Sequence, residues 1–176
     1  YHSNFKYTVR SEWDKWWSEG WLRAGTNGSI YGNGGQSGDL KINTSDLPDV
    51  KTEVTTDAGL APILKTKWAR ETTGYDNWIV PAAKDLRKDL GISPSDYQVK
   101  WLAAWVKEFG IDGFRCDTAK HVDLFRWKQL KTAANTALQE WRAANPSKAG
   151  ANWTENFWMT GEVYDMGYGY QSDYAT

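Results

Sequence analysis

The side chains with the most chemical potential lie together in one short stretch, DGFRCDTAKH at residues 112–121. It contains two carboxylates, a guanidinium, an ammonium, an imidazole and the only cysteine of the 176-residue chain. A further carboxylate lies in a second stretch, FWMTGEVY at residues 157–164. One carboxylate beside an arginine and another among aromatic residues are suited to nucleophilic attack and to proton donation, respectively. The two stretches indicate catalysis if the fold brings them together.

The elements around these stretches follow the order helix, strand, helix, strand. Ser93-Pro94 is a favourable helix start, and apolar residues then recur at spacings of three and four up to Gly110. Residues 111–117 have the pattern of a short strand, residues 122–144 that of a second helix, and residues 157–164 form a second apolar run. Strands separated by a long helix predict a parallel pair. Nearer the N-terminus, a short helix over residues 11–22 capped by Ser11 is also predicted.

A parallel pair would bring the carboxylates to the same edge of a sheet. Arg115 and Asp117 share one face of their strand because side chains alternate. Functional groups gather at the carboxyl ends of parallel strands, where Asp117 and Glu162 both lie. Neighbouring strands are about 4.8 Å apart, so these carboxylates are expected roughly 5 Å from each other, the separation of retaining glycoside hydrolysis.

The two carboxylates are expected in unlike environments. Asp117, close to the cation of Arg115, would stay ionised and act as a nucleophile. Glu162, among aromatic residues and facing a negative charge, would keep its proton and donate it to a leaving oxygen. The alternative interpretation is structural: Arg115 and Asp117 form an ion pair, and Glu162 caps the next helix.

These residues carry a family resemblance. GFRCDTAKH at 113–121 resembles the second signature segment of the α-amylase family of glycoside hydrolases, G-F-R-x-D-x-x-K-H, at every fixed position. GEVY at 161–164 is similar to the third segment, and LPD at 47–49 to a short segment near the end of domain B. Stretches around residues 13–21, 47–53 and 111–130 look like the periplasmic α-amylases of Gram-negative bacteria, which implies a periplasmic or secreted location.

The resemblance implies a retaining hydrolase of α-1,4-glucosidic bonds in starch and maltodextrins. It assigns Asp117 as nucleophile, Glu162 as general acid/base and Arg115 as the residue that orients Asp117. It also assigns substrate-binding roles to Lys120, His121 and Tyr164. A transglycosylase of the same family and a non-catalytic relative that binds glucan are the alternatives.

The resemblance also implies a structural Ca²⁺, a cation that prefers oxygen ligands. The matching positions are the carboxylate of Asp49 and the backbone carbonyl of His121. Asp49 has a simpler interpretation as well, because Pro-Asp is common in turns.

The implied fold is α/β: part of a (β/α)₈ TIM barrel, about strands 4–5 with flanking helices, at residues 93–176. It is preceded by an irregular, loop-rich, domain B-like insertion at residues 1–92. The family's first and fourth segments contain Asn-His, which this sequence lacks, so the third catalytic carboxylate is missing. A barrel needs about 250 residues. We therefore expect an internal fragment, inactive alone, whose partner is the remainder of its own barrel.

Composition excludes several other functions. A net charge of −1 without charge blocks gives no footprint for nucleic acid, and no apolar run approaches the roughly 20 residues of a membrane span. The single Cys116 excludes an internal disulfide and multi-cysteine metal sites, and we expect its thiol to be buried and inert. The 12 Trp and 9 Tyr suit core packing and also stacking on sugar rings.

Overall fold

The computed structural model describes residues 9–23, 40, 48–71 and 81–163 of the chain. The chain divides into two compact units. The first consists of residues 1–76 and 88–95, and the second of residues 77–87 and 96–176. The predicted domains, 1–92 and 93–176, stay a prediction. In the described parts, no helix is both long enough and apolar enough to cross a membrane.

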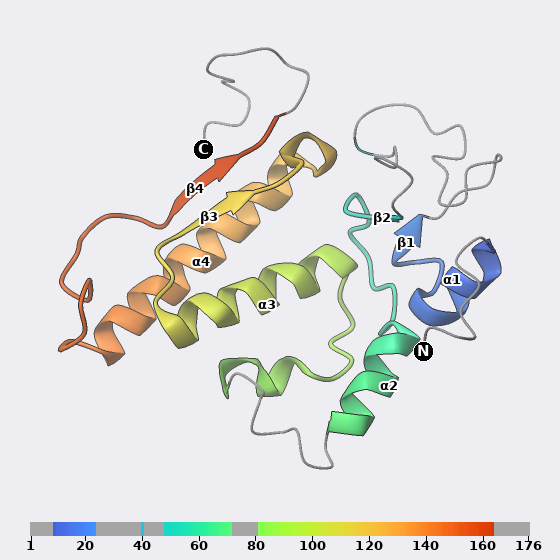
Figure 1. Ribbon diagram of the computed structural model, residues 1–176, viewed down its shortest axis with the longest axis horizontal. Helices are drawn as coiled ribbons and strands as arrows, with labels where there is room; N and C mark the ends of the chain where they lie inside the picture. The colour runs from blue at the N-terminus through green and yellow to red at the C-terminus, as the bar shows by residue number, and fades with distance from the viewer. Residues whose placement is uncertain (1–8, 24–39, 41–47, 72–80, 164–176) are drawn as a thin grey trace. The chain divides into compact units, whose positions relative to one another are not determined.

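The described residues of the first unit form two helices and a short antiparallel strand pair (Figure 1). Its elements are α1 (Arg10–Trp17), β1 (Leu22–Arg23), β2 (Asp49–Val50) and α2 (Pro62–Glu71). In the antiparallel pair Leu22 lies opposite Val50, and Arg23 lies opposite Asp49. The cross-strand partners Arg23 and Asp49 have opposite charge, a combination that stabilises a pair of strands.

The N-terminal helix differs from the prediction at its start. The N-cap of α1 is Val9, whose carbonyl accepts a bond of 3.0 Å from the backbone N–H of Glu12, and no side chain caps the helix. Ser11 is already inside the helix, so the predicted Ser11 cap is wrong. The helix also ends earlier than predicted, because Ser18 adopts a left-handed φ of 65°. Helix α2 has no counterpart among the predicted elements.

The second unit confirms the predicted order of helix, strand, helix and strand. After the 3₁₀ helix η3 (Pro81–Leu86), its elements are α3 (Pro94–Phe109), β3 (Gly113–Cys116), the 3₁₀ turn η4 (Ala119–His121), α4 (Leu124–Ala144) and β4 (Trp158–Gly161). Strands β3 and β4 pair in parallel, with Arg115 opposite Thr160 and Cys116 opposite Gly161. The parallel pair predicted from the sequence is therefore confirmed.

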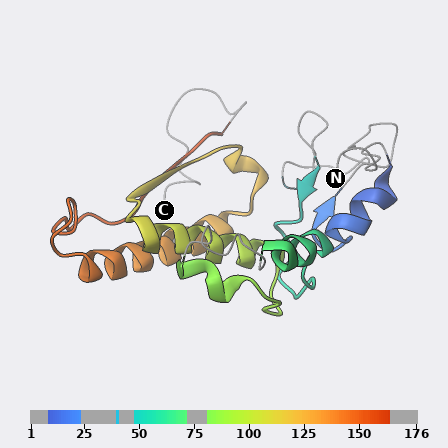
Figure 2. The same cartoon turned by 60° about the horizontal axis from the view of Figure 1, so that its bottom comes forward.

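One face of this strand pair is covered by both long helices, as Figures 1 and 2 show. Phe114 of β3 meets the buried Phe157 edge to face, with ring centroids 5.0 Å apart. Val106 of α3 and Leu138 of α4 complete the same apolar cluster. Since side chains alternate along β3, packing Phe114 against the helices turns Arg115 to the opposite, solvent-exposed face.

The end of α3 is fixed by a glycine. Gly110 has a φ of +65°, and a Cβ added there would lie 2.4 Å from the ring of Trp141 on α4. Only glycine fits both the left-handed backbone and the indole that covers it. The end of α3 at this glycine allows β3 to begin three residues later, which determines the position of Arg115 on that strand.

Candidate active site

The three predicted catalytic residues come together at the carboxyl ends of β3 and β4. The Arg115 guanidinium donates from Nη1 to Oδ1 of Asp117 at 3.1 Å and from Nη2 to Oε2 of Glu162 at 3.0 Å. One planar cation therefore bridges two carboxylates from different strands, a geometry that suits arginine and not lysine. The sequence predicted the pairing of Arg115 with Asp117, but not its second bond to Glu162.

Backbone hydrogen bonds hold Glu162 in place next to β3. Its N–H donates to the Cys116 carbonyl at 2.9 Å, and its own carbonyl accepts from the N–H of Ala119 at 2.8 Å. The neighbouring Gly161 allows this approach, because a Cβ there would be 2.8 Å from the Cβ of Ala119. A glycine at the first position of the GEVY stretch therefore allows the close packing that positions the glutamate.

The turn after β3 carries Asp117 on an unusual backbone. Thr118 is left-handed, with φ 48° and ψ 40°, a conformation uncommon for residues other than glycine. Its backbone N–H is a hydrogen-bond donor to the Asp117 carboxylate. Strained backbone of this kind often lies at functional sites.

The pKa of Asp117 lies below its ordinary value. The largest cause is a side-chain hydrogen bond with Glu162, followed by the charge and hydrogen bond of Arg115 and the Thr118 N–H, while partial desolvation acts the other way. All these favourable contacts stabilise the ionised carboxylate. The carboxylate thus stays available to attack an electrophile.

The site is open to solvent. The side chains of Arg115, Asp117 and Glu162 are 59%, 69% and 41% exposed. A ligand could therefore reach both carboxylates from the face opposite the helices. Because water screens these exposed charges, the ion pairs contribute little to stability. Their main role is to hold the three side chains in position.

The predicted substrate-binding residues lie directly after Asp117. Lys120 and His121 belong to the turn η4, where the His121 N–H donates to the Thr118 carbonyl at 2.9 Å. Trp127 of α4 supports this turn by donating from Nε1 to the Ala119 carbonyl at 3.0 Å. Tyr164 lies outside the described residues.

Cys116 is half-buried, less than the sequence interpretation expected. Burial raises the pKa of its thiol, and the charge of Arg115 opposes that effect. A raised pKa leaves little thiolate at neutral pH, which agrees with the expected inert thiol.

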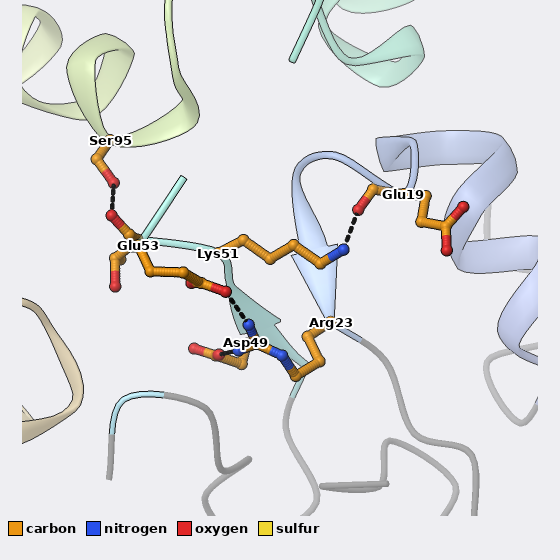
Figure 3. A network of polar contacts seen from close by, with 7 residues as sticks. Glu19, Arg23, Asp49, Lys51, Glu53 and Ser95 are labelled. Carbon is orange, nitrogen blue, oxygen red and sulfur yellow. Dashed lines mark hydrogen bonds and ion pairs between the residues drawn. The ribbon is translucent and has the colours of Figure 1, made fainter. Parts of the chain in front are cut away.

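The predicted calcium ligand Asp49 lies in the first unit, in the polar network of Figure 3. Its carboxylate pairs with the guanidinium of Arg23, which also pairs with Glu53. The second oxygen of Glu53, Oε2, is buried and has no hydrogen-bond partner within the described ranges. The other predicted ligand, the His121 carbonyl, belongs to the second unit.

Asp49 and Glu53 offer carboxylate oxygens, the ligand type that Ca²⁺ prefers, but both carboxylates are paired with the Arg23 guanidinium. Among the residues with a described position, no group of three or more His, Cys, Asp or Glu side chains is arranged to hold a metal. The predicted calcium site stays a prediction.

Sequence reasoning did not find Arg23 and Glu53. They lie 30 positions apart: Arg23 is on β1, and Glu53 follows β2, the strand that pairs with β1. The opposite-charge pair of Arg23 with Asp49 at facing strand positions is a signal for Arg23, but it is readable only once the register is known.

Comparison with known proteins finds similarity along almost the entire chain. Over 174 residues, 99% of this chain, it is 42% identical to the periplasmic alpha-amylase of Escherichia coli (strain K12), of which it spans 23%. It is also 40% identical over 72 residues to an alpha-amylase of Streptomyces lividans, covering 41% of this chain and 7% of that protein. No protein-family model matches.

Proposed function

Because this chain belongs to the α-amylase family over almost its whole length, we propose that the protein it forms part of hydrolyses α-1,4-glucosidic bonds in starch and maltodextrins. The single observation that supports this most directly is Arg115, which bonds to both Asp117 and Glu162 at neighbouring strand ends. The proposed mechanism is retaining double displacement, in which one carboxylate attacks and the other transfers protons. The experiment that tests it is product analysis of maltoheptaose incubated with the full-length protein.

In the first step an oxygen of Asp117 attacks the anomeric carbon. The bond from that carbon to the leaving oxygen breaks, and the proton of Glu162 passes to this oxygen. In the second step a water attacks the anomeric carbon, the bond from that carbon to the Asp117 oxygen breaks, and Glu162 takes up a proton of that water. The products are two shorter glucans, one released in each step, and the original enzyme. The glucan released in the second step keeps the configuration of its anomeric carbon.

The division of roles is supported by the lowered pKa of Asp117, which keeps this carboxyl ionised beside the Arg115 guanidinium. Asp117 would then be the ionised nucleophile and Glu162 the proton donor. Arg115 would hold both in register, while Lys120, His121 and Tyr164 would contact the glucan.

A methionine at position 115 should change the pH dependence of activity. Arg115 lowers the pKa of Asp117, so Arg115→Met should raise this pKa, and Asp117 would be protonated at a higher pH. The acidic limb of kcat/KM should therefore shift to higher pH. Arg115→Lys, which keeps the charge but loses the bridging geometry, should shift the limb less; an unchanged limb in both variants would mean that Arg115 does not influence the nucleophile.

The parallel β3–β4 pair and its two helices would be part of a (β/α)₈ barrel, at about strands 4–5. Support comes from the α-amylase relatives and from the placement of functional groups at strand carboxyl ends. Residues 1–92 would then be a domain B-like insertion. The similarity to a periplasmic relative supports a periplasmic or secreted location.

Calcium is proposed as a structural cation, held by the Asp49 carboxylate and the His121 backbone carbonyl. It would supply positive charge next to the carboxylate of Asp49. In the full-length protein, EDTA should lower Tm, and Ca²⁺ should restore it. Asp49→Asn should abolish most of this response; a Tm indifferent to EDTA and Ca²⁺ would contradict the proposal.

Hydrolysis and transglycosylation share the glycosyl-enzyme and differ in what intercepts it. If all products are shorter than maltoheptaose, the reaction is hydrolysis. Products longer than maltoheptaose indicate transfer. A protein that binds maltoheptaose without altering it would be the non-catalytic relative.

A further inference from the structure

The turn η4 is held between β4 and the start of α4 through Ala119, a residue that is only 3% exposed. The backbone N–H of Ala119 donates to the carbonyl of Glu162 at 2.8 Å. Its own carbonyl accepts a bond of 3.0 Å from Nε1 of Trp127 on α4. Its methyl group lies against Gly161, since a Cβ built on that glycine would be 2.8 Å from it. Ala119 therefore links the side chain of Trp127 to the backbone of the proposed acid/base residue.

The part of α4 that carries Trp127 is itself fixed. Trp127 lies in the first turn of the helix, next to Arg126, which is buried. The guanidinium of Arg126 donates from Nη1 to Oδ1 of Asp96, in the first turn of α3, at 2.8 Å. Separating an ion pair whose guanidinium is buried is costly, because it leaves a charge away from water. The indole of Trp127 is thus attached to a turn of α4 that is tied to α3.

We propose that Trp127 is a positioning residue for Glu162: by holding Ala119, its indole N–H fixes the backbone from which the Glu162 carboxyl group extends. The inference rests on the proposed function, in which Glu162 transfers the protons. Proton transfer needs the two oxygens within hydrogen-bond reach, and a displacement of about 1 Å can cost roughly 10²-fold in rate. Because Trp127 acts through a backbone contact, its loss should cost less than loss of the Glu162 carboxyl group itself.

The same turn also follows Asp117, but the two catalytic carboxyl groups are held differently. The Asp117 carboxylate accepts a bond of 3.1 Å from Nη1 of Arg115, a contact that does not pass through α4. The backbone of Glu162, in contrast, accepts directly from Ala119, the residue that Trp127 holds. Loss of the indole N–H should therefore disturb proton transfer by Glu162 more than attack by Asp117.

The experiment compares two substrates, maltoheptaose and α-maltosyl fluoride with azide, in the full-length protein carrying Trp127→Phe. The substitution keeps an aromatic ring, and the Ala119 carbonyl still accepts from the Val122 N–H at 3.3 Å. With maltoheptaose, kcat should fall by about 10-fold, because both steps need proton transfer. Fluoride leaves without protonation and azide attacks without a base. Turnover of the fluoride with azide should therefore stay within about twofold of that of the unsubstituted protein.

A second variant removes the donor and keeps the shape of the side chain. Benzothienylalanine in place of Trp127 carries sulfur where the indole has its N–H, and it should show the same unequal loss. The matched control is Trp21→Phe in the first unit, where Nε1 donates to the Gly59 carbonyl at 2.7 Å. This control loses the same kind of bond, so it should lower Tm while the ratio of the two activities stays that of the unsubstituted protein.

The outcomes separate this inference from the proposed function. Equal losses with both substrates would overturn the inference, because Trp127 would then act on Asp117 or on the fold as a whole. Unchanged turnover of maltoheptaose would overturn it as well, and the benzothienylalanine protein decides if the two variants differ. In both cases the activity of the unsubstituted protein leaves the proposed function intact. If the unsubstituted protein cleaves neither substrate, the proposed function is wrong, and this inference is wrong with it.

Discussion

Asp117→Asn in the full-length protein is expected to lower kcat for maltoheptaose by roughly 10⁴- to 10⁶-fold, the range seen when a nucleophile is removed from a catalytic unit. The amide has nearly the shape of the carboxylate and can still accept the Arg115 bond of 3.1 Å. It cannot, however, form the glycosyl ester at a useful rate. Glucan affinity, measured by calorimetry, should therefore change little while turnover collapses.

A matched control comes from the other end of the same strand. Asp112 directly precedes β3, and its backbone carbonyl accepts a bond of 2.9 Å from the Trp158 N–H. Asp112→Asn keeps that backbone bond and should leave kcat near that of the unsubstituted protein. Substantial residual activity in Asp117→Asn, above that of a Glu162 variant, would mean that another group is the nucleophile.

The sequence was most informative where local chemistry decides the structure. Ser93-Pro94 and Gly110 correctly bounded α3, because a cap, a fixed φ and a left-handed glycine act within a few residues. The parallel pairing of β3 with β4 followed from the helix between them. The convergence of Asp117 and Glu162 then needed only the rule that parallel strands end at one edge.

The sequence was least informative where the outcome depends on distant partners. The preference for Ser as an N-cap predicted a start at Ser11, yet α1 begins one residue earlier without a side-chain cap. Packing within the unit overrides a cap preference of about 1 kcal/mol. The Arg23–Asp49 contact depends on a strand register that no local pattern encodes.

The bridge from Arg115 to Glu162 illustrates the same limit within the site itself. Alternation along β3 placed Arg115 on the face of Asp117, which is a local property. Its second bond depends on the register Cys116 opposite Gly161, which brings the next residue, Glu162, beside the guanidinium. That register is set by Phe114 and Phe157 packing against α3 and α4, and so by the whole unit.

Glu162→Gln should have the second-largest effect, and it should depend on the leaving group. With maltoheptaose, kcat should fall by about 10³-fold or more, because general acid–base catalysis contributes roughly 10²–10⁴ and Gln has no proton to transfer. With α-maltosyl fluoride the first step should be nearly normal, since fluoride leaves without protonation. The variant should then release fluoride in a burst and accumulate a glycosyl ester on Asp117, visible by mass spectrometry.

Azide provides the decisive measurement for Glu162. This anion needs no base, so it should attack the ester on Asp117 directly, release a glycosyl azide of retained configuration and restore turnover of the fluoride in Glu162→Gln. Azide should not rescue Asp117→Asn, where no ester forms. Glu140→Gln, an exposed glutamate of α4 paired with Lys107 at 2.7 Å, is the matched control and should behave as the unsubstituted protein does. Equal loss with maltoheptaose and with the fluoride, without azide rescue, would show that Glu162 does not transfer the proton and that its bond to Arg115 is its main contribution.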